Sequence, residues 1–334
     1  MAALAANNPT LLDVAKRTDP DGKIATLVEL LSQDNPILED LTFVEGNLPT
    51  GHKTSVRTGL PDPTWRKLYG GVQPTKSTSA QITDTCGMLE AYAEVDKALA
   101  DLNGNTAAFR LSEDKAHIEG MNQKAAYAIF YETEATNPER ITGLAPRYNS
   151  LSAQNADNII DAGGTGDDNM SIWLCAWGPN SGHGIYPKGS QAGLQMSDKG
   201  QVTIENVDGA GGRMEGYRTH YRWDLGLSIR DWRYFGRVCN IDYSVLNAGD
   251  AGAVTAQKSL ITHMIKLSER VKTTGARAVW YVPKNIRENL RLGILEKISG
   301  NLSWESVEGK RVMTFDDIPV KVVDALTKTE ARVV

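Results

Sequence analysis

The sequence of residues 213–242, RMEGYRTHYRWDLGLSIRDWRYFGRVCNID, places six arginines among tyrosine, tryptophan and phenylalanine rings, with few acidic residues to oppose them. Cations that neutralise phosphate and rings that stack on bases are what a single-stranded nucleic-acid platform needs. Arginine, tryptophan and tyrosine are equally the residues that dominate the binding energy of protein interfaces. The segment therefore predicts a binding surface whose partner is either a nucleic acid or another protein.

Within this segment, residues 227–241 predict one long strand. Successive side chains of a strand point to opposite faces, and here both faces mix apolar and charged residues. The strand of an isolated subunit would instead separate a core face from a solvent face. We therefore expect this strand to leave a core and enter subunit contacts, with its arginines pairing acidic groups within or between subunits. Its candidate interface residues are Arg230, Trp232, Arg233, Tyr234 and Arg237.

The composition of the whole chain favours a protein partner over DNA. The 334 residues are 41% hydrophobic and 23% charged, which is typical of a soluble globular protein with two or more domains. The net charge is −5, whereas a protein that mainly grips DNA usually has a basic balance. The arginine-rich segment is thus a local exception, suited to acidic groups on another protein surface.

The sequence predicts neither disulfides nor a targeting segment. Cys86, Cys175 and Cys239 lie far apart without a C-x-x-C pair, which predicts reduced and buried thiols. The first residues lack the charged and apolar regions of a signal peptide. No apolar run approaches the roughly 20 residues that a membrane helix needs. We expect a cytoplasmic protein without a membrane partner.

Upstream of the arginine-rich segment, the sequence predicts an arm followed by a long hairpin. Residues 1–50 contain an apolar stripe at helical spacing over residues 24–31, which a short arm helix could not bury alone. Residues 51–95 predict two strands joined by a segment rich in glycine, proline and threonine, which is typical of an extended tip. Exposed aromatic and basic residues on such a tip favour contact with a partner. These tip candidates are Trp65, Arg66, Lys67 and Tyr69.

The strongest periodic signal predicts a helix over residues 106–133, about 40 Å long. Residues 150–215 are rich in loops with short strands, and one strand is predicted at 171–177. The irregular alternation of helices and strands indicates an α+β fold. The apolar stripe of the long helix consists of Leu111, Ile118, Met121, Ala125, Ala128 and Ile129. The later predicted elements are helices at 255–273 and 284–298, a buried strand at 276–282 and a closing hairpin at 311–325.

No constellation in the sequence predicts catalysis or metal binding. The glycine cluster DAGGTGDDN lacks the P-loop pattern and the EF-hand spacing, and its aspartates would repel phosphate. The five histidines include no pair at helical spacing, and Ser181 and His183 lie in a glycine-rich loop without a positioned acid. We therefore expect no catalytic residue, no cofactor, no metal and no enzymatic activity.

The order of these elements resembles the major capsid protein family of tailed bacteriophages, which has the Hong Kong 97 (HK97) fold, and the style is closest to short-tailed phages. The family order is an N-terminal arm, an extended loop, a spine helix, a long peripheral strand, an axial domain and a closing hairpin. The long strand is matched by GLSIRDWRYFGRVCNID (226–242) and the hairpin by TFDDIPVKVVDAL (314–326). The resemblance implies an arm at 1–50, an extended loop at 51–95, a peripheral domain at 96–242 and 311–334 with a loop-rich insertion around 150–215, and an axial domain at 243–310.

This resemblance implies a structural protein that self-assembles into hexamers and pentamers of an icosahedral shell around a double-stranded DNA genome, without sequence-specific binding. The expected partners are a separate scaffolding protein, a portal protein and a cement or decoration protein. The expected location is the virion capsid, reached through a procapsid that is assembled in the host cytoplasm and then matures. The alternatives are an encapsulin-type compartment, an unrecognised soluble metabolic enzyme and a single-stranded DNA-binding protein.

Overall fold

The first of two sheets organises the hairpin and the basic segment. This computed structural model describes residues 32–334 except 105, 206–210, 249–250, 296–301 and 308–309, so the predicted arm helix at 24–31 lies outside the described residues. The strand order is β1-β6-β8-β3-β2, and β7 pairs with β8 beyond the end of β6. The strands are β1 (Phe43–Glu45), β2 (Gly51–Gly59), β3 (Thr78–Asp96), β6 (Gly182–Tyr186), β7 (Leu194–Glu205) and β8 (Arg213–Ile229).

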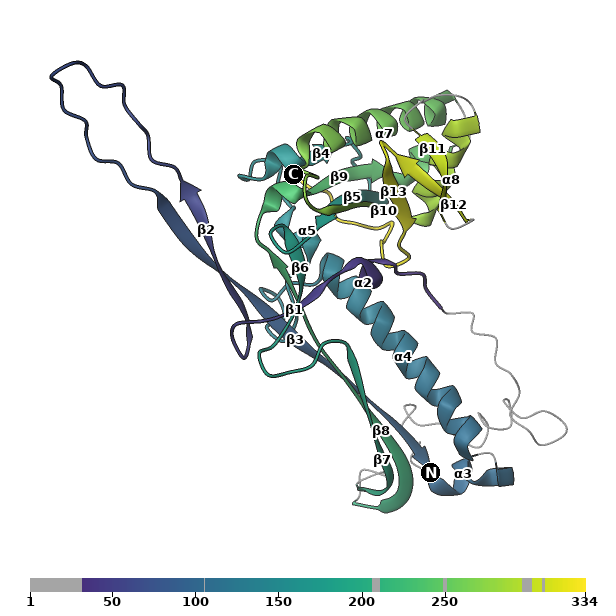
Figure 1. The fold of residues 1–334 in the computed structure, drawn as a ribbon. Helices are drawn as coiled ribbons and strands as arrows, with labels where there is room; N and C mark the ends of the chain where they lie inside the picture. Colours follow the sequence, from purple (N-terminus) through teal and green to yellow (C-terminus); the bar gives the residue numbers. More distant parts are fainter. Residues whose placement is uncertain (1–31, 105, 206–210, 249–250, 296–301, 308–309) are drawn as a thin grey trace.

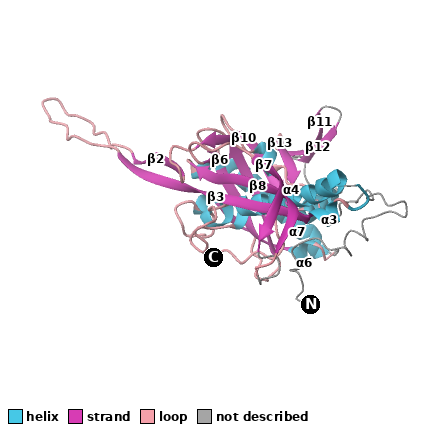
Figure 2. Ribbon diagram, turned by 90° about the horizontal axis from the view of Figure 1, so that it is seen from below, coloured by secondary structure: helices cyan, strands magenta, loops and turns pink. Residues whose placement is uncertain are grey.

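Strand β3 belongs to both the hairpin and the body. It runs for 19 residues and pairs with β2 as far as Thr85, then with β8 from Cys86 onward. Beyond the paired part of β2 and β3, residues 60–77 form the tip, which projects away from the body in Figures 1 and 2. The structure confirms the predicted hairpin, because a strand so long can support two different neighbours along its length.

Helix α4 (Thr106–Tyr131) confirms the predicted long helix and packs on β3 and β8. The apolar stripe was predicted correctly in its second half, where Met121, Ala125 and Ile129 are buried. It was wrong in its first half, because Leu111 and Ile118 are 55% and 39% exposed. Phe109 anchors that half instead, and Leu111 lies about 200° around the helix from it.

The second sheet carries the other core. Its order is β11-β12-β13-β10-β5-β9-β4, and helices α7 and α8 bury their apolar sides against it. Strand β5 is buried along its whole length, since α4 contributes to the core on the opposite face. The elements are β4 (Ile159–Asp161), β5 (Asn169–Trp177), β9 (Phe235–Asp242), α7 (Ala251–Arg270), β10 (Arg277–Val282), α8 (Lys284–Leu295), β11 (Leu302–Val307), β12 (Lys310–Phe315) and β13 (Ile318–Val322).

Short elements connect these sheets and helices. Helix α2 (Ile37–Asp40) precedes β1, and α3 (Lys97–Ala100) with the 3-10 turn η1 (Leu102–Gly104) leads from β3 into α4. Figure 1 shows α7, α8 and the second sheet at one end of the molecule, and α4 with β7 and β8 extending to the other. The remaining short elements are α5 (Leu144–Arg147), η2 (Ala156–Asn158), η3 (Trp232–Tyr234) and α6 (Tyr243–Leu246).

The second sheet does not respect the expected boundaries at residues 242 and 310. Strands β4, β5 and β9 come from the segment expected in the peripheral domain. Strand β10 comes from the expected axial domain. Strand β13, and β12 apart from its first residue, come from the closing segment. Met170 and Val238 share one hydrophobic cluster with Trp280 and Phe315. Strands from both segments therefore close one core.

The long strand expected at residues 227–241 was wrong. Strand β8 ends at Ile229, the chain turns through η3, and β9 then begins in the other sheet. Asp231 starts this turn, because its side chain accepts a hydrogen bond from the backbone N–H of Arg233 at 3.1 Å. The apparent mixing of apolar and charged residues on both faces thus comes from two strands of different sheets. The region around 150–215 contains the short strands β4 and β6 and the longer β5 and β7, the last with 12 residues.

Candidate functional site

The candidate residues fall into two groups, one at the tip of the hairpin and one near its root. At the tip, Trp65 and Tyr69 are fully exposed and Leu68 is 91% exposed. Arg66 and Lys67 lie beside them and are also exposed. Figure 1 shows this tip far from the body of its own chain. Large apolar side chains gathered on a projecting loop are typical of surfaces that contact another molecule.

A tight turn sets the direction of the tip. The backbone N–H of Gly70 donates to the carbonyl oxygen of Lys67 at 3.0 Å. Tyr69 has a φ of 61°, in the left-handed region that a side chain normally avoids at a cost of about 1–2 kcal/mol. The chain reverses at residues 67–70, and Trp65, Arg66 and Lys67 lie at the start of this turn, where one partner surface could contact all three.

Near the root of the hairpin, Arg230 contacts a buried polar cluster. Its Nη1 donates to the carbonyl oxygen of Pro179 at 2.9 Å, and its Nη2 lies 3.0 Å from Nε2 of His52. His52 is paired in register with Asp84, whose Oδ1 accepts from Nη2 of Arg147 at 2.8 Å. Arg230, just after β8, is thereby tied to β2, and Arg147 at the end of α5 is tied to β3.

The histidines of this root cluster are held neutral. Burial is the main cause that lowers the pKa of His52, and the charge of Arg230 lowers it further against the opposing pull of Asp84. Burial likewise lowers the pKa of His183, whose ring lies edge-on to that of His52 with centroids 5.9 Å apart. Because Arg230 donates to Nε2, His52 carries its hydrogen on Nδ1, and protonating Nε2 would break this contact.

Acidification below pH 6.5 is expected to destabilise this root cluster. The folded pKa of His52 lies below its ordinary 6.5, so the unfolded chain binds a proton that the folded chain does not. The stability that His52 contributes is present above pH 6.5 and is lost as the pH falls through its lower folded pKa. Urea unfolding between pH 7 and pH 5 should show a shallower decline for His52→Gln than for the unaltered chain. Equal declines would contradict the assignment.

Arg233, Trp232 and Tyr234 form the short turn between the two sheets. Arg233 pairs with Asp231 through two hydrogen bonds, Nε to Oδ1 at 2.8 Å and Nη2 to Oδ2 at 2.7 Å. Its side chain remains half-exposed. Trp232 and Tyr234 are partly buried against the first core cluster. The turn therefore has its own internal ion pair and leaves cationic and aromatic surface for a further contact.

Arg237 lies inside the subunit, although it was proposed for the subunit interface. It is only 3% exposed, and its Nη2 donates to Oε2 of Glu330 at 2.7 Å. The guanidinium also donates to Ser171 Oγ and to the carbonyl oxygen of Tyr148, both at 2.9 Å. The expected pairing with an acid is thus confirmed within the chain, and its burial rules out a direct contact with a neighbour.

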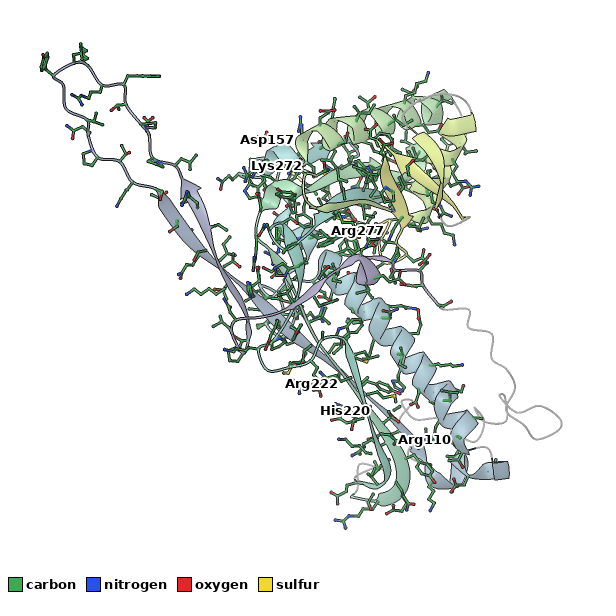
Figure 3. The ribbon with its side chains drawn as sticks, in the orientation of Figure 1. Arg110, Asp157, His220, Arg222, Lys272 and Arg277 are labelled. Atoms are coloured by element: carbon green, nitrogen blue, oxygen red, sulfur yellow. The ribbon has the colours of Figure 1, made fainter. Side chains whose placement is uncertain are left out.

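Within β8, the arginines are paired with acids of their own sheet. Arg218 Nε lies 2.7 Å from Glu94 on β3, and Arg222 Nε lies 3.0 Å from Asp224. His220 and Arg222 follow one another along β8 in Figure 3, and His220 lies 3.3 Å from Glu90 on β3. Much of the positive charge of the basic segment is therefore compensated locally, which disfavours the nucleic-acid platform.

The motifs weighed for chemistry have structural roles. The hydroxyl of Ser181 donates to the carbonyl oxygen of Gly178, and the buried His183 contacts the carbonyl oxygen of Gly184. Asp168 accepts from the backbone N–H of Ser244. In the described residues there is no group of histidine, cysteine and acidic side chains that could hold a metal ion. No helix among them is long and apolar enough to cross a membrane.

Sequence reasoning missed the root cluster. His52, Asp84, His183 and Arg230 come from three strands and the end of a fourth, and the contact between His52 and Arg230 joins residues 178 positions apart. Arg230 and His183 were singled out for other reasons, and no spacing pattern connects the four residues. Only the pairing of β2 with β3, and of β8 with β3 and β6, brings them together.

Comparisons with known proteins agree on one family. The model of the family described as major capsid protein GP7 matches residues 19–334. The chain is similar to a solved structure of bacteriophage epsilon15, with 36% identity, a TM-score of 0.77 and 99% of each chain covered. No curated protein sequence matches the chain.

More distant structural matches were also found. A capsid chain of bacteriophage JBD30 has 11% identity and a TM-score of 0.47 over 96% of this chain and 99% of that one. The SrpI encapsulin of Synechococcus elongatus PCC 7942 has 11% identity and a TM-score of 0.41 over 70% and 97%. Both scores lie below 0.5, so the fold is assigned from the epsilon15 structure.

Proposed function

This chain belongs to the major capsid protein GP7 family, and on that premise we propose that it self-assembles into hexamers and pentamers of an icosahedral shell around double-stranded DNA. Its fold is the HK97-like fold of phage capsids, and it is a bacteriophage major capsid protein. The hairpin β2–β3 is its extended loop and α4 its spine helix.

The exposed tip is the observation that carries the assembly proposal. Trp65, Leu68 and Tyr69 are almost entirely exposed on a loop held away from the body. A subunit that lays this tip over a neighbour, and receives a tip in turn, makes at least two such contacts. Contacts repeated around a closed shell reinforce one another, so that each can be modest while the shell is stable.

The proposed location is the virion capsid, after assembly in the host cytoplasm. The proposed partners besides other copies of the chain are a scaffolding protein, a portal protein and a cement or decoration protein. DNA is enclosed without sequence-specific recognition. The net charge of −5 supports this, since strong contacts between basic residues and phosphate would hold the genome against the wall.

The family assignment favours a phage shell over an encapsulin-type compartment, a soluble metabolic enzyme or a single-stranded DNA-binding protein. We propose a structural role without enzymatic activity. Electron microscopy of the purified full-length chain, alone and with its scaffolding protein, tests the proposal. Closed shells of uniform size are expected. Monomers or dimers under all conditions would overturn it.

Charge reversal at Arg233 is expected to weaken assembly more than folding. Arg233→Glu places a second carboxylate beside Asp231 in a half-exposed pair, and such pairs contribute about 1 kcal/mol or less to folding. If this turn meets a neighbouring subunit, the reversed charge should lower the yield of shells about tenfold. Urea unfolding of the subunit and counting of shells by electron microscopy measure the two effects.

Arg213→Glu is the matched control for this charge reversal. Arg213 forms an exposed ion pair with Glu205 at 3.2 Å on the β7–β8 hairpin, away from the turn. It should show the same small change in the free energy of unfolding without loss of shells. Equal losses of assembly in the two variants would mean that the turn at Arg233 has no specific interface role.

A further inference from the structure

An open apolar slot lies between α4 and strand β3. It encloses about 160 Å³, and its floor is formed by the buried side chains of Ala125, Ile141 and Leu225. Ala128 leaves the slot unfilled on the side of α4, and Gly87 packs closely on the side of β3, where an added Cβ would lie 3.1 Å from the carbonyl oxygen of Glu139. A cavity of this size suits one aromatic ring, since an apolar cavity of about 150 Å³ accommodates benzene.

The rim of the slot combines apolar and charged groups. Met88 is 66% exposed at its edge, which is unusual for a large apolar side chain in a strand. Glu139 is 71% exposed on the rim and forms a loose ion pair with Arg140, whose Nε lies 3.8 Å away, and Lys124 lies on the same rim. The slot can therefore receive a ring on its floor and a cation beside Glu139.

The tip of the hairpin offers the matching groups, in Trp65 followed by Arg66 and Lys67. Its own slot is out of reach, because β3 runs without a break from Thr78 to Gly87 and beyond. Nine strand residues span about 30 Å, and the tip lies farther still from the slot. An occupant from the tip must therefore come from a second copy of the chain.

Charge supports the same pairing. Residues 51–80 contain five basic residues and one acidic residue, for a net charge of +4. Since the whole chain carries −5, the rest of it carries −9, from −5 minus +4. A basic hairpin projecting from an acidic body is attracted to the body of a neighbour and repelled by a neighbouring hairpin.

We propose that Trp65 of one subunit inserts its indole into the slot between Gly87 and Ala128 of a neighbouring subunit, with Arg66 beside Glu139. The inference rests on the proposed shell, and it assigns the receiving surface of the extended loop. A buried tryptophan flanked by charged residues is the usual composition of an interface hot spot. The cations of Arg140 and Lys124 stand at the rim, where either can lie against the indole face.

A second depression is the alternative receiving site. It encloses about 570 Å³ on the other side of Met88 and is lined by more polar groups, among them Lys188, Arg222 and Asp224. Asp224 is buried there and accepts close hydrogen bonds from Ser190 and Arg222, whereas Glu139 is exposed and lies 3.8 Å from Arg140, which leaves it open to a further cation. Its larger volume and polar lining fit a single indole less well than the slot does.

Cysteine cross-linking in assembled shells distinguishes the two sites. Arg66→Cys with Glu139→Cys should give a ladder of disulfide-linked subunits on oxidation, whereas Arg66→Cys with Lys188→Cys reports on the second depression. Arg66→Cys alone is the control for the native thiols. Cys175 and Cys239 are buried, and burial with nearby Asp224 and Asp84 raises the pKa of Cys86 to about 12, so these thiols should contribute little.

A ladder in the Glu139 pair, absent from the control, supports the proposal. Shells with a ladder only in the Lys188 pair, or with none in either pair, overturn it while the proposed shell stands. If the unaltered chain forms no shells, the proposed function fails and this inference fails with it.

Filling the slot gives a second test that does not depend on new thiols. Ala128→Phe should occupy the slot and lower the yield of shells at least tenfold, with an unchanged unfolding transition. Ala116→Phe, at an exposed position of the same helix, should leave assembly unchanged. Normal assembly of a folded Ala128→Phe subunit would overturn the proposal.

Discussion

Deleting residues 61–71 is expected to abolish shell formation and leave a folded, soluble subunit. Residues 61–69 are exposed, so the deletion removes no buried side chain from either core. Strands β2 and β3 stay paired from Gly51–Thr85 to Gly59–Thr78, and a shorter loop can close them at little cost in chain entropy. Folding and assembly should therefore separate in this variant.

The expected loss of assembly is large because one deletion removes a contact from every subunit. Truncating a hot-spot residue costs at least about 2 kcal/mol, or roughly 30-fold in an association constant. Each subunit both gives and receives the tip contact, so the losses compound around a closed shell. The critical concentration for assembly should rise beyond any concentration used in the experiment.

Analytical ultracentrifugation and electron microscopy measure this effect, and circular dichroism reports on the fold. The control replaces residues 61–71 by a glycine-serine segment of equal length, which keeps the reach of the loop and removes its side chains. Loss of shells in both variants assigns the contact to the side chains. Shells formed by the deletion variant at the usual concentration would contradict the interface role of the tip.

Local sequence patterns predicted the elements whose secondary structure depends on residues close in sequence. The helix at 106–131 follows from apolar residues at a period of 3.6, and the hairpin follows from two strands around a segment rich in glycine and proline. Strand β5 appears in the sequence as a continuous apolar run, which is typical of a strand covered on both faces. In these cases the neighbouring residues alone carry the information.

The break between β8 and β9 could not be predicted from alternation. Leu227 and Ile229 belong to the first core cluster, while Val238 and Ile241 belong to the second. The period of two continues across the turn at Asp231, so the pattern hides the change of sheet. Only the partners of each strand, β3 and β6 for β8 and β5 and β4 for β9, reveal it.

The candidate site divides in the same way. Exposed aromatic residues on a loop of glycine and proline predicted the tip, because composition alone implies exposure there. Arg237 lies in the arginine-rich segment 213–242, whose composition also predicted exposure, yet it is buried. Its partner Glu330 lies 93 residues away along the chain. The sequence shows that the two residues carry opposite charges, but nothing in it indicates that they lie close together in the folded chain.

The buried pair of Arg237 and Glu330 fastens the C-terminal segment to the second sheet. Besides Arg237, Glu330 accepts hydrogen bonds from the hydroxyls of Ser171 and Tyr131, and its backbone N–H donates to Asn169. The guanidinium carbon of Arg237 lies 5.1 Å from the ring centroid of Trp173. Near the end of this segment, the backbone N–H of Val333 donates to Asn240, so several contacts depend on its position.

Arg237→Ala is therefore expected to destabilise the subunit by about 3–5 kcal/mol, because it leaves the buried Glu330 carboxylate without its cation. Urea unfolding measures this loss, and Arg213→Ala, which breaks an exposed pair, should cost about 1 kcal/mol or less. The double variant Arg237→Met with Glu330→Leu should recover part of the stability, since it removes the uncompensated carboxylate but leaves the hydroxyls of Ser171 and Tyr131 without their acceptor. If Arg237→Ala costs no more than Arg213→Ala, the pair does not hold the C-terminal segment. If the double variant recovers no stability over the single one, the uncompensated charge is not the source of the loss.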